Sequence, residues 1–133
     1  MCSSDLYRAA VDARLILVVD AEAAVRQSLI DVLSLDGHEV DAADDADSAL
    51  LLLDQRRYDL VMADVHMPNL DGPALLDALA ERFGDALPRI VFLTRGAFDP
   101  HYGSFLANLR VPVLTKPLKP GRVLELVGRL FQP

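Results

Sequence analysis

Two kinds of segment alternate along the chain, as the pattern of hydrophobic and polar positions shows. Short, uninterrupted apolar runs are typical of strands that are buried on both faces, as they are in parallel sheets. Longer segments with apolar residues at every third or fourth position are typical of amphipathic helices. Strand and helix follow one another five times, which predicts an α/β fold with right-handed crossovers and helices on both faces of a parallel sheet.

Turn residues between these runs mark where the expected elements begin and end. Asp45 and Asp71 are good N-caps, because an Asp side chain accepts a hydrogen bond from the first helical turn. Asp36-Gly37 is a typical C-terminal stop. The predicted strands cover residues 15–19, 39–43, 60–63, 89–94 and 111–115, and the predicted helices cover residues 22–35, 46–56, 72–83, a segment from Asp99-Pro100 to Leu109, and a segment from Pro120 to Leu130.

We expect the flavodoxin-like winding, a doubly wound five-stranded (βα)5 sheet in a three-layer αβα sandwich. In that winding the helices after the first and fifth strands cover one face of the sheet, and the other three cover the opposite face. A chain of 133 residues, of which 52% are hydrophobic, is enough for one domain. We place this domain at residues 14–131 and interpret the mixed, polar residues 1–13 as a tail or linker.

Composition narrows the range of partners and compartments. The formal net charge of −7 argues against nucleic acid and anionic membranes as direct partners. The single cysteine, Cys2, cannot form an internal disulfide, and no apolar run approaches the roughly 20 residues of a membrane span. The first residues lack the basic and apolar regions of a secretion signal, so we expect a cytoplasmic protein.

Four of the expected strands end in a polar residue, namely Asp20, Asp64, Thr94 and Lys116. Taken alone, Asp20 could cap the next helix, Thr94 could be a turn residue, and Lys116 could be a solvated loop lysine. The carboxyl ends of parallel strands share one edge of the sheet, where ligands bind in open α/β folds. The four residues together therefore predict a site.

Phosphoryl transfer onto a carboxylate is the chemistry that suits two acids, a hydroxyl and an ammonium. Asp64 is the expected nucleophile and phosphoacceptor, and a divalent cation, expected to be Mg²⁺, bridges the acids and the phosphoryl oxygens. Lys116 pairs with the carboxylate and then with the phosphoryl group, and Thr94 donates a hydrogen bond to the new oxygens. The phosphoryl group adds about 1.5 to 2 negative charges, which is enough to alter a nearby surface.

Four pieces of sequence, in their order and spacing, resemble a response-regulator receiver domain over residues 14–131. They are Leu-Ile-Leu-Val-Val-Asp20, the segment from Asp64 to Gly72, Val-Phe-Leu-Thr94 and Leu-Thr-Lys116-Pro117. The resemblance implies phosphorylation of Asp64 by a phosphohistidine of a histidine kinase or phosphotransfer protein, with Mg²⁺ beside it. It implies no enzymatic activity beyond this transfer and slow loss of the phosphoryl group to water. Residues 93–117 are similar to receivers of hybrid sensor histidine kinases, so a stand-alone receiver and a piece of a hybrid kinase both stay open.

Ala21 departs from the family pattern, which has a second acid at this position that binds the metal directly. The remaining metal ligands implied by the resemblance are Asp64, the backbone carbonyl of His66 and water, with Asp20 acting through water. Glu22 is expected to lie one residue too far along to substitute without a shift. Loss of one carboxylate beside a cation predicts roughly tenfold or greater loss of Mg²⁺ affinity, which Ala21→Asp should recover.

Two further positions differ from the family, and one histidine lies close to the site. Val113 stands where the family has an aromatic residue whose rotation reports phosphorylation, which argues against output through such a rotation. Arg95 follows Thr94, where a small residue is usual. Its long side chain either controls access to Asp64, pairs with the phosphoryl group on Asp64, or faces solvent. His66 lies two residues after Asp64, so its side chain either tunes the lifetime of the phosphoryl group or, as is more usual at such a position, is solvated.

Two other functions stay open at this stage. Ala21 and Val113 favour a degenerate receiver that binds proteins without phosphorylation, through the face formed by the fourth helix, fifth strand and fifth helix. The same face permits a homodimer, although no residue compels one. A hydrolase of the haloacid-dehalogenase type also uses an aspartate at a strand end, but His66 replaces its second acid and the sequence has no segment for a cap domain.

Overall fold

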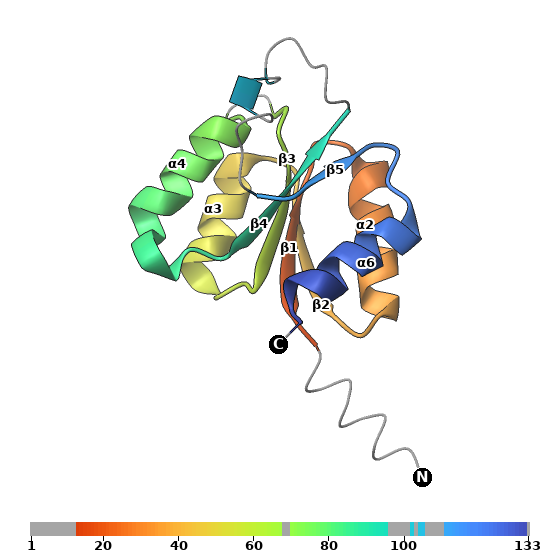
Figure 1. Ribbon diagram of the computed structural model, residues 1–133. Helices are drawn as coiled ribbons and strands as arrows, with labels where there is room; N and C mark the ends of the chain where they lie inside the picture. The colour runs from red at the N-terminus through yellow and green to blue at the C-terminus, as the bar shows by residue number, and fades with distance from the viewer. Residues whose placement is uncertain (1–12, 68–69, 96–101, 103, 106–110, 133) are drawn as a thin grey trace.

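The computed structural model describes residues 13–67, 70–95, 102, 104–105 and 111–132 of the chain. Five parallel strands in these residues form one sheet in the order β2-β1-β3-β4-β5, with helices on both faces (Figure 1). The predicted flavodoxin-like α/β fold is therefore confirmed. The elements are β1 (Leu15–Val19), α2 (Ala23–Leu35), β2 (Glu39–Ala43), α3 (Ala46–Gln55), β3 (Leu60–Asp64), α4 (Gly72–Phe83), a short 3-10 helix η1 (Gly84–Ala86), β4 (Arg89–Thr94), β5 (Val113–Thr115) and α6 (Pro120–Leu130).

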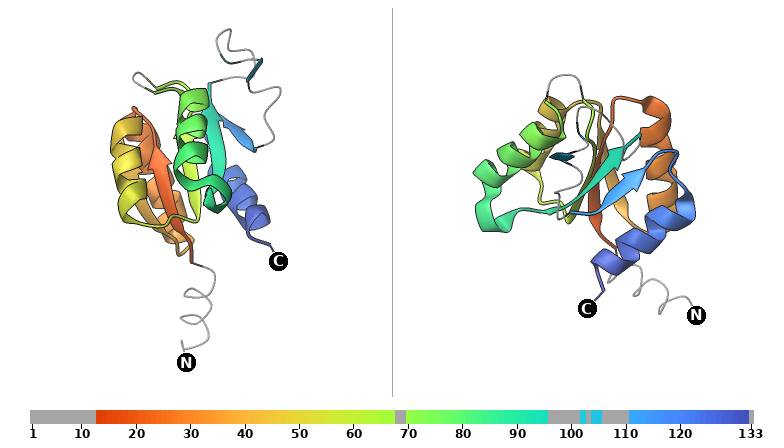
Figure 2. Two further views of the ribbon diagram at one scale, coloured as in Figure 1. Left: turned by 90° about the vertical axis from the view of Figure 1, so that its left-hand side faces the viewer. Right: turned by 45° about the horizontal axis from the view of Figure 1, so that its top comes forward.

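The side chains of β1 separate two hydrophobic layers. Ile16 and Val18 belong to a buried cluster with α2 and α6, whereas Leu17 and Val19 belong to a cluster with α3 and α4. Successive side chains of a strand point to opposite faces, so a strand that is covered on both faces is apolar throughout. α2 and α6 lie on one face and α3 and α4 on the other (Figures 1 and 2), as the predicted winding requires of these four helices.

Helix starts agree closely with the sequence. Asp45 Oδ1 accepts a hydrogen bond from the Ser48 N–H at 2.8 Å, which confirms this N-cap. Asp71 Oδ1 accepts one from the Ala74 N–H at 3.1 Å, which confirms the second. Glu22, expected inside the first helix, is instead its N-cap residue, and its side chain makes no capping hydrogen bond. This leaves the carboxylate of Glu22 available for other partners.

The fifth strand is shorter than predicted. β5 begins at Val113 rather than at residue 111, because Pro112 has no N–H to donate to the ladder. The carbonyl of Pro112 still accepts a hydrogen bond from the Phe92 N–H at 3.0 Å. The edge strand therefore stays attached to β4 while presenting only a short ladder.

Two predicted segments lie largely outside the described residues. They are the helix from Asp99-Pro100 to Leu109 and the tail at residues 1–13. Tyr102 and Phe105, which were expected on the apolar face of that helix, pack against the hydrophobic layer of α3 and α4. This contact lies on the face of the sheet where the predicted winding places the helix from Asp99-Pro100 to Leu109.

Gly72 lets the loop after β3 fold tightly against the sheet. Its N–H donates a hydrogen bond to the Val65 carbonyl at 2.8 Å, so the start of α4 returns to the end of β3. A Cβ atom at this position would lie 2.6 Å from Val65 Cγ2 and 3.1 Å from both Val65 Cα and Phe92 Cε1. The close approach of backbone and side chains therefore requires glycine here.

Gly72→Ala is expected to lower the free energy of unfolding by about 1–3 kcal/mol, because the added methyl overpacks a filled core. The matched control is Gly128→Ala in α6, where an added Cβ would meet nothing within 4 Å. The control should raise the free energy of unfolding by about 0.4–1 kcal/mol. Urea unfolding followed by circular dichroism measures both, and equal effects of the two substitutions would contradict the packing argument.

Candidate functional site

The carboxyl ends of four strands bring the predicted residues to one edge of the sheet. Asp20 follows β1, Asp64 ends β3, Thr94 ends β4 and Lys116 follows β5. The Lys116 N–H donates a hydrogen bond to the Thr94 carbonyl at 2.7 Å, which continues the pairing of the last two strands by one residue. Asp20, Asp64 and Thr94 are buried. The residues predicted from the strand ends are therefore neighbours in the fold.

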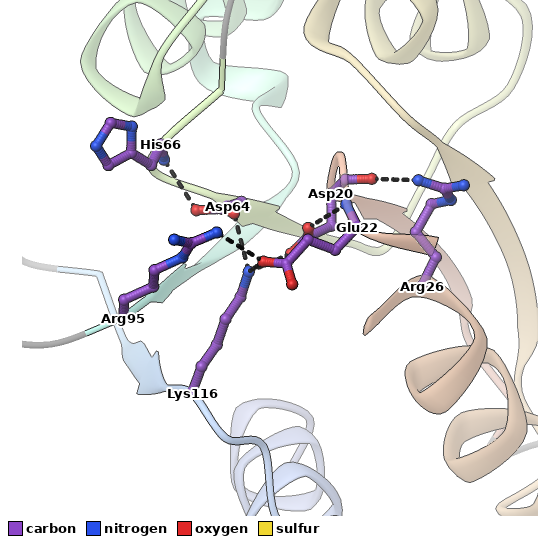
Figure 3. Close-up of polar contacts among 7 residues, drawn as sticks. All are labelled: Asp20, Glu22, Arg26, Asp64, His66, Arg95 and Lys116. Carbon is purple, nitrogen blue, oxygen red and sulfur yellow. Dashed lines mark hydrogen bonds and ion pairs between the residues drawn. The ribbon is translucent and has the colours of Figure 1, made fainter. Parts of the chain in front are cut away.

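The ammonium of Lys116 lies among three carboxylates (Figure 3). Its Nζ is 2.8 Å from Asp20 Oδ2, 2.9 Å from Asp64 Oδ2 and 3.1 Å from Glu22 Oε1. Burial lowers the pKa of Lys116, but its close contacts with the carboxylates of Asp20 and Asp64 outweigh this effect, so the pKa is raised above its ordinary value. Lys116 is therefore a permanent positive charge at neutral pH.

Asp64 is held through both of its oxygens. The backbone N–H of His66 donates to Oδ1 at 2.9 Å, and the ammonium of Lys116 donates to Oδ2 at 2.9 Å. The ring of His66 is exposed, points away from Asp64 in Figure 3, and meets the Tyr102 ring edge-on at 5.1 Å between centroids. The backbone of His66 thus holds the carboxylate, while its exposed ring contacts Tyr102.

Asp20 divides its two oxygens between the loop and the site. Oδ1 accepts a hydrogen bond from the Glu22 N–H at 2.9 Å, and the Asp20 carbonyl accepts one from Arg26 Nη1 at 2.7 Å. Asp20 therefore does not cap α2, whose N-cap residue is Glu22, and its Oδ1 instead closes the turn that precedes the helix. Oδ2 is buried and accepts no hydrogen bond of good geometry, although the Lys116 ammonium lies 2.8 Å from it as an ion pair. Asp20 thus presents one oxygen to the site.

Glu22 requires a correction to the sequence argument. We expected it to lie too far along the loop to contribute, but its Oε1 is 3.1 Å from Lys116 Nζ and 3.1 Å from Arg95 Nη2. The hydrogen bond and charge of Lys116, followed by those of Arg95, lower the pKa of Glu22. Glu22 stands at an N-cap position but its side chain does not cap the helix. This can be seen only in the structure, so the sequence held no usable signal for its role.

Arg95 joins the two loops at the edge of the sheet. Its guanidinium pairs with Glu22, while 72% of its side chain remains exposed. The expectation that Arg95 faces solvent is therefore met for most of its side chain, and the guanidinium also contacts Glu22 at the rim of the site. Among the described contacts, the carboxylates of Asp20, Glu22 and Asp64 form ion pairs with two cations, Lys116 and Arg95.

The carboxylates fit a hard divalent cation. One oxygen each from Asp20, Glu22 and Asp64 lies within 4.8 Å of the others. Mg²⁺ prefers such oxygen ligands and usually keeps several waters, and the buried Oδ2 of Asp20 lacks a hydrogen bond that a metal-bound water could supply. Ala21 is exposed and adds no side-chain donor. The residues present therefore suit Mg²⁺ even without an acid at position 21.

The fold and this site define the chain as an α/β signalling module of the receiver class. Residues 16–128 match the family model described as the response regulator receiver domain, and the chain belongs to that family. Receiver domains are signalling modules rather than classical enzymes, and they interact with histidine kinases or phosphotransfer proteins. Within the described residues, no helix is long and apolar enough to cross a membrane.

Three relatives illustrate the match. The chain is 35% identical over 114 residues to "Response regulator protein FleR" of Pseudomonas aeruginosa, which covers 86% of this chain and 24% of that protein. It is 32% identical over 126 residues to "Sensor histidine kinase AruS" of the same organism, covering 92% of this chain and 12% of that protein. The solved structure of chemotaxis protein CheY4 of Vibrio cholerae has a TM-score of 0.79 and 26% identity, covering 90% of this chain and 99% of that one. The chain thus spans a quarter or less of the two curated relatives.

Lys116→Met is expected to lower the free energy of unfolding at neutral pH by about 3 kcal/mol, because it leaves two buried carboxylates without their shared cation. Lys119→Met, at an exposed lysine of the same loop, is the matched control and should change stability by less than about 0.5 kcal/mol. Urea unfolding in the presence of EDTA excludes any contribution from bound metal. Equal stability of the two variants would contradict a role of Lys116 in compensating the carboxylates.

The pH dependence of this difference has a definite sign. Because the folded-state pKa of Lys116 is raised above 10.5, its stabilisation is complete below that value and is lost as the pH rises through the folded-state pKa. The difference between wild type and Lys116→Met should therefore stay constant from neutral to mildly alkaline pH and narrow only above 10.5. A difference that closes near neutral pH would show that the ammonium is not held as the structure indicates.

Proposed function

We propose that the chain is a phosphorelay receiver that accepts a phosphoryl group from phosphohistidine onto Asp64. The observation that carries the proposal is the contact between Lys116 Nζ and Asp64 Oδ2 at 2.9 Å, at the end of a buried strand. A lysine in this place neutralises the carboxylate before transfer and the phosphoryl oxygens after it. Thr94, at the end of the neighbouring strand, is proposed to donate its hydroxyl to those oxygens.

The transfer is a displacement at phosphorus. An oxygen of Asp64 attacks, the new O–P bond forms, and the P–N bond to the donor imidazole breaks. The imidazole leaves neutral when its other nitrogen carries a proton. The N–H of His66 and the ammonium of Lys116 orient the carboxylate, so little reorganisation precedes the attack.

Asp20, Asp64 and the backbone carbonyl of His66 are the residues proposed to hold Mg²⁺. When bound, the ion supplies positive charge to the transferred phosphoryl oxygens. The absence of a carboxylate at Ala21 is proposed to weaken this binding. Calorimetric titration should therefore show that Ala21→Asp lowers the dissociation constant for Mg²⁺. An unchanged constant would show that the missing carboxylate at position 21 does not weaken Mg²⁺ binding.

A histidine kinase or a histidine phosphotransfer protein is the proposed partner, because each carries phosphohistidine. The added charge of about −1.5 to −2 is proposed to change a protein-binding face of the domain. Val113 is not aromatic, so this change is proposed to proceed without a rotating aromatic residue at that position. A second candidate, a binding module that works without phosphorylation, is favoured by Ala21 and Val113.

Phosphorylation of Asp64 can be tested directly. Incubation with acetyl phosphate and Mg²⁺, followed by intact-protein mass spectrometry, should show the mass of one phosphoryl group on wild type. This label should be acid-stable and base-labile, and it should be absent from Asp64→Asn. Asp77→Asn, at an exposed aspartate of α4, is the matched control and should be labelled like wild type.

Three outcomes decide between the two candidates. Loss of the label in Asp64→Asn alone supports the receiver function. Label that persists in Asp64→Asn places the phosphoryl group elsewhere and overturns the assignment. If wild type takes no label under conditions that label an ordinary receiver domain run in parallel, the phosphorylation-independent binding module is the better function.

A further inference from the structure

We infer that Glu22 supplies the metal-binding carboxylate that Ala21 cannot supply, and that Arg95 competes with the metal for it. The inference rests on the proposed function, because it concerns the Mg²⁺ that assists phosphorylation of Asp64. It goes further by assigning a ligand at a position that is two residues beyond Asp20 and belongs to the start of α2.

The local backbone directs Glu22 toward the site. Asp20 Oδ1 accepts the Glu22 N–H at 2.9 Å, which tightens the turn after β1. Glu22 has extended backbone angles (φ −86°, ψ 116°) and makes no side-chain cap, so its carboxylate is not needed by α2. The glutamate side chain is one methylene longer than aspartate, and its Oε1 reaches the same ammonium that contacts Asp64 (Figure 3).

A second observation points to a cation between these acids. Asp20 is fully buried, and its Oδ2 accepts no hydrogen bond of good geometry, although an ion pair with Lys116 at 2.8 Å neutralises it. Carboxylates rarely remain buried with oxygens short of hydrogen bonds. A metal-bound water beside this oxygen, with Glu22 and Asp64 on the metal, satisfies all three carboxylates, whose oxygens already lie within 4.8 Å of one another.

Arg95 is the competitor because it holds the same oxygen. Both Arg95 Nη2 and Lys116 Nζ lie 3.1 Å from Glu22 Oε1. Lys116 has two other carboxylate partners, whereas Glu22 is the one carboxylate that pairs with Arg95 among the described contacts. A metal that takes Glu22 must therefore displace this exposed ion pair, which is a weak one in water.

The test is calorimetric titration of Mg²⁺ into the unphosphorylated protein, with Mn²⁺ titration followed by electron paramagnetic resonance as a second probe. Glu22→Gln should raise the dissociation constant by about tenfold or more, since it removes a charged ligand at contact distance. Glu81→Gln, at an exposed glutamate of α4, is the matched control and should leave the constant unchanged.

Two further variants separate direct ligation from a long-range charge effect. Glu22→Asp keeps the charge but withdraws the carboxylate by one methylene, so direct ligation predicts a weaker site, whereas a long-range effect predicts wild-type affinity. Ala21→Asp in the Glu22→Gln background should restore binding, which shows that a carboxylate is missing and that the variant is folded. Failure of this rescue in a folded double variant would overturn the inference.

Arg95→Ala tests the competition. It should tighten Mg²⁺ binding by about threefold in wild type, because an exposed ion pair is weak in water and its release costs little. In the Glu22→Gln background the gain should be clearly smaller, since the pair that Arg95 made is already absent. Equal gains in the two backgrounds would mean that Arg95 acts through its charge alone and would overturn this part of the inference.

Metal binding and phosphorylation are scored by separate measurements, so the two proposals can fail separately. Mg²⁺ binding that depends on Glu22, without any label on Asp64, would overturn the receiver function and leave the metal site standing. Label on Asp64 with equal Mg²⁺ affinity in wild type and Glu22→Gln would overturn the inference and leave the function standing.

Discussion

The buried ammonium of Lys116 is the interaction on which the edge of the sheet depends. Asp20 and Asp64 are withdrawn from water, and buried carboxylates are costly unless a cation and hydrogen bonds compensate them. A single lysine reaches both, and it comes from the end of β5, which is 96 positions from Asp20 and 52 from Asp64. The charge balance of the site therefore exists only when the parallel sheet is complete from β1 to β5.

The same arrangement explains why the site is rigid on one side and adjustable on the other. Asp64 ends a buried strand, and the Gly72 N–H draws the following loop back to Val65. Asp20 is fixed by the turn that it forms with the Glu22 N–H. Glu22 itself lies on the solvent side, where its partner Arg95 is largely exposed. A ligand that binds here therefore meets two carboxylates in fixed positions, those of Asp20 and Asp64, and a third, that of Glu22, which can exchange one partner for another.

The sequence predicted most of this structure because its signals are local or follow from topology. Apolar runs reveal strands, Asp45 and Asp71 reveal helix starts, and strand-end residues must meet in a parallel sheet. Glu22 was misjudged because the sequence position of its Cα says little about where a flexible side chain finds opposite charge. Its partners, Arg95 and Lys116, are 73 and 94 positions away. No local pattern reports such a contact. The start of β5 is different, because Pro112 is a local signal that the predicted start at residue 111 left out of account.

The replacement of one acid by another at a different position has a physical cost, which sets how strong the metal site can be. An aspartate at position 21 would have fewer rotatable bonds to order, whereas Glu22 must be ordered over a longer side chain and released from Arg95. The ion pair also has a benefit, because Lys116 and Arg95 hold the Glu22 carboxylate beside Asp64 before any metal arrives. Preorganisation and competition thus act through the same contacts, and their balance places the expected affinity between that of a site with no third carboxylate and that of a site with an aspartate at position 21.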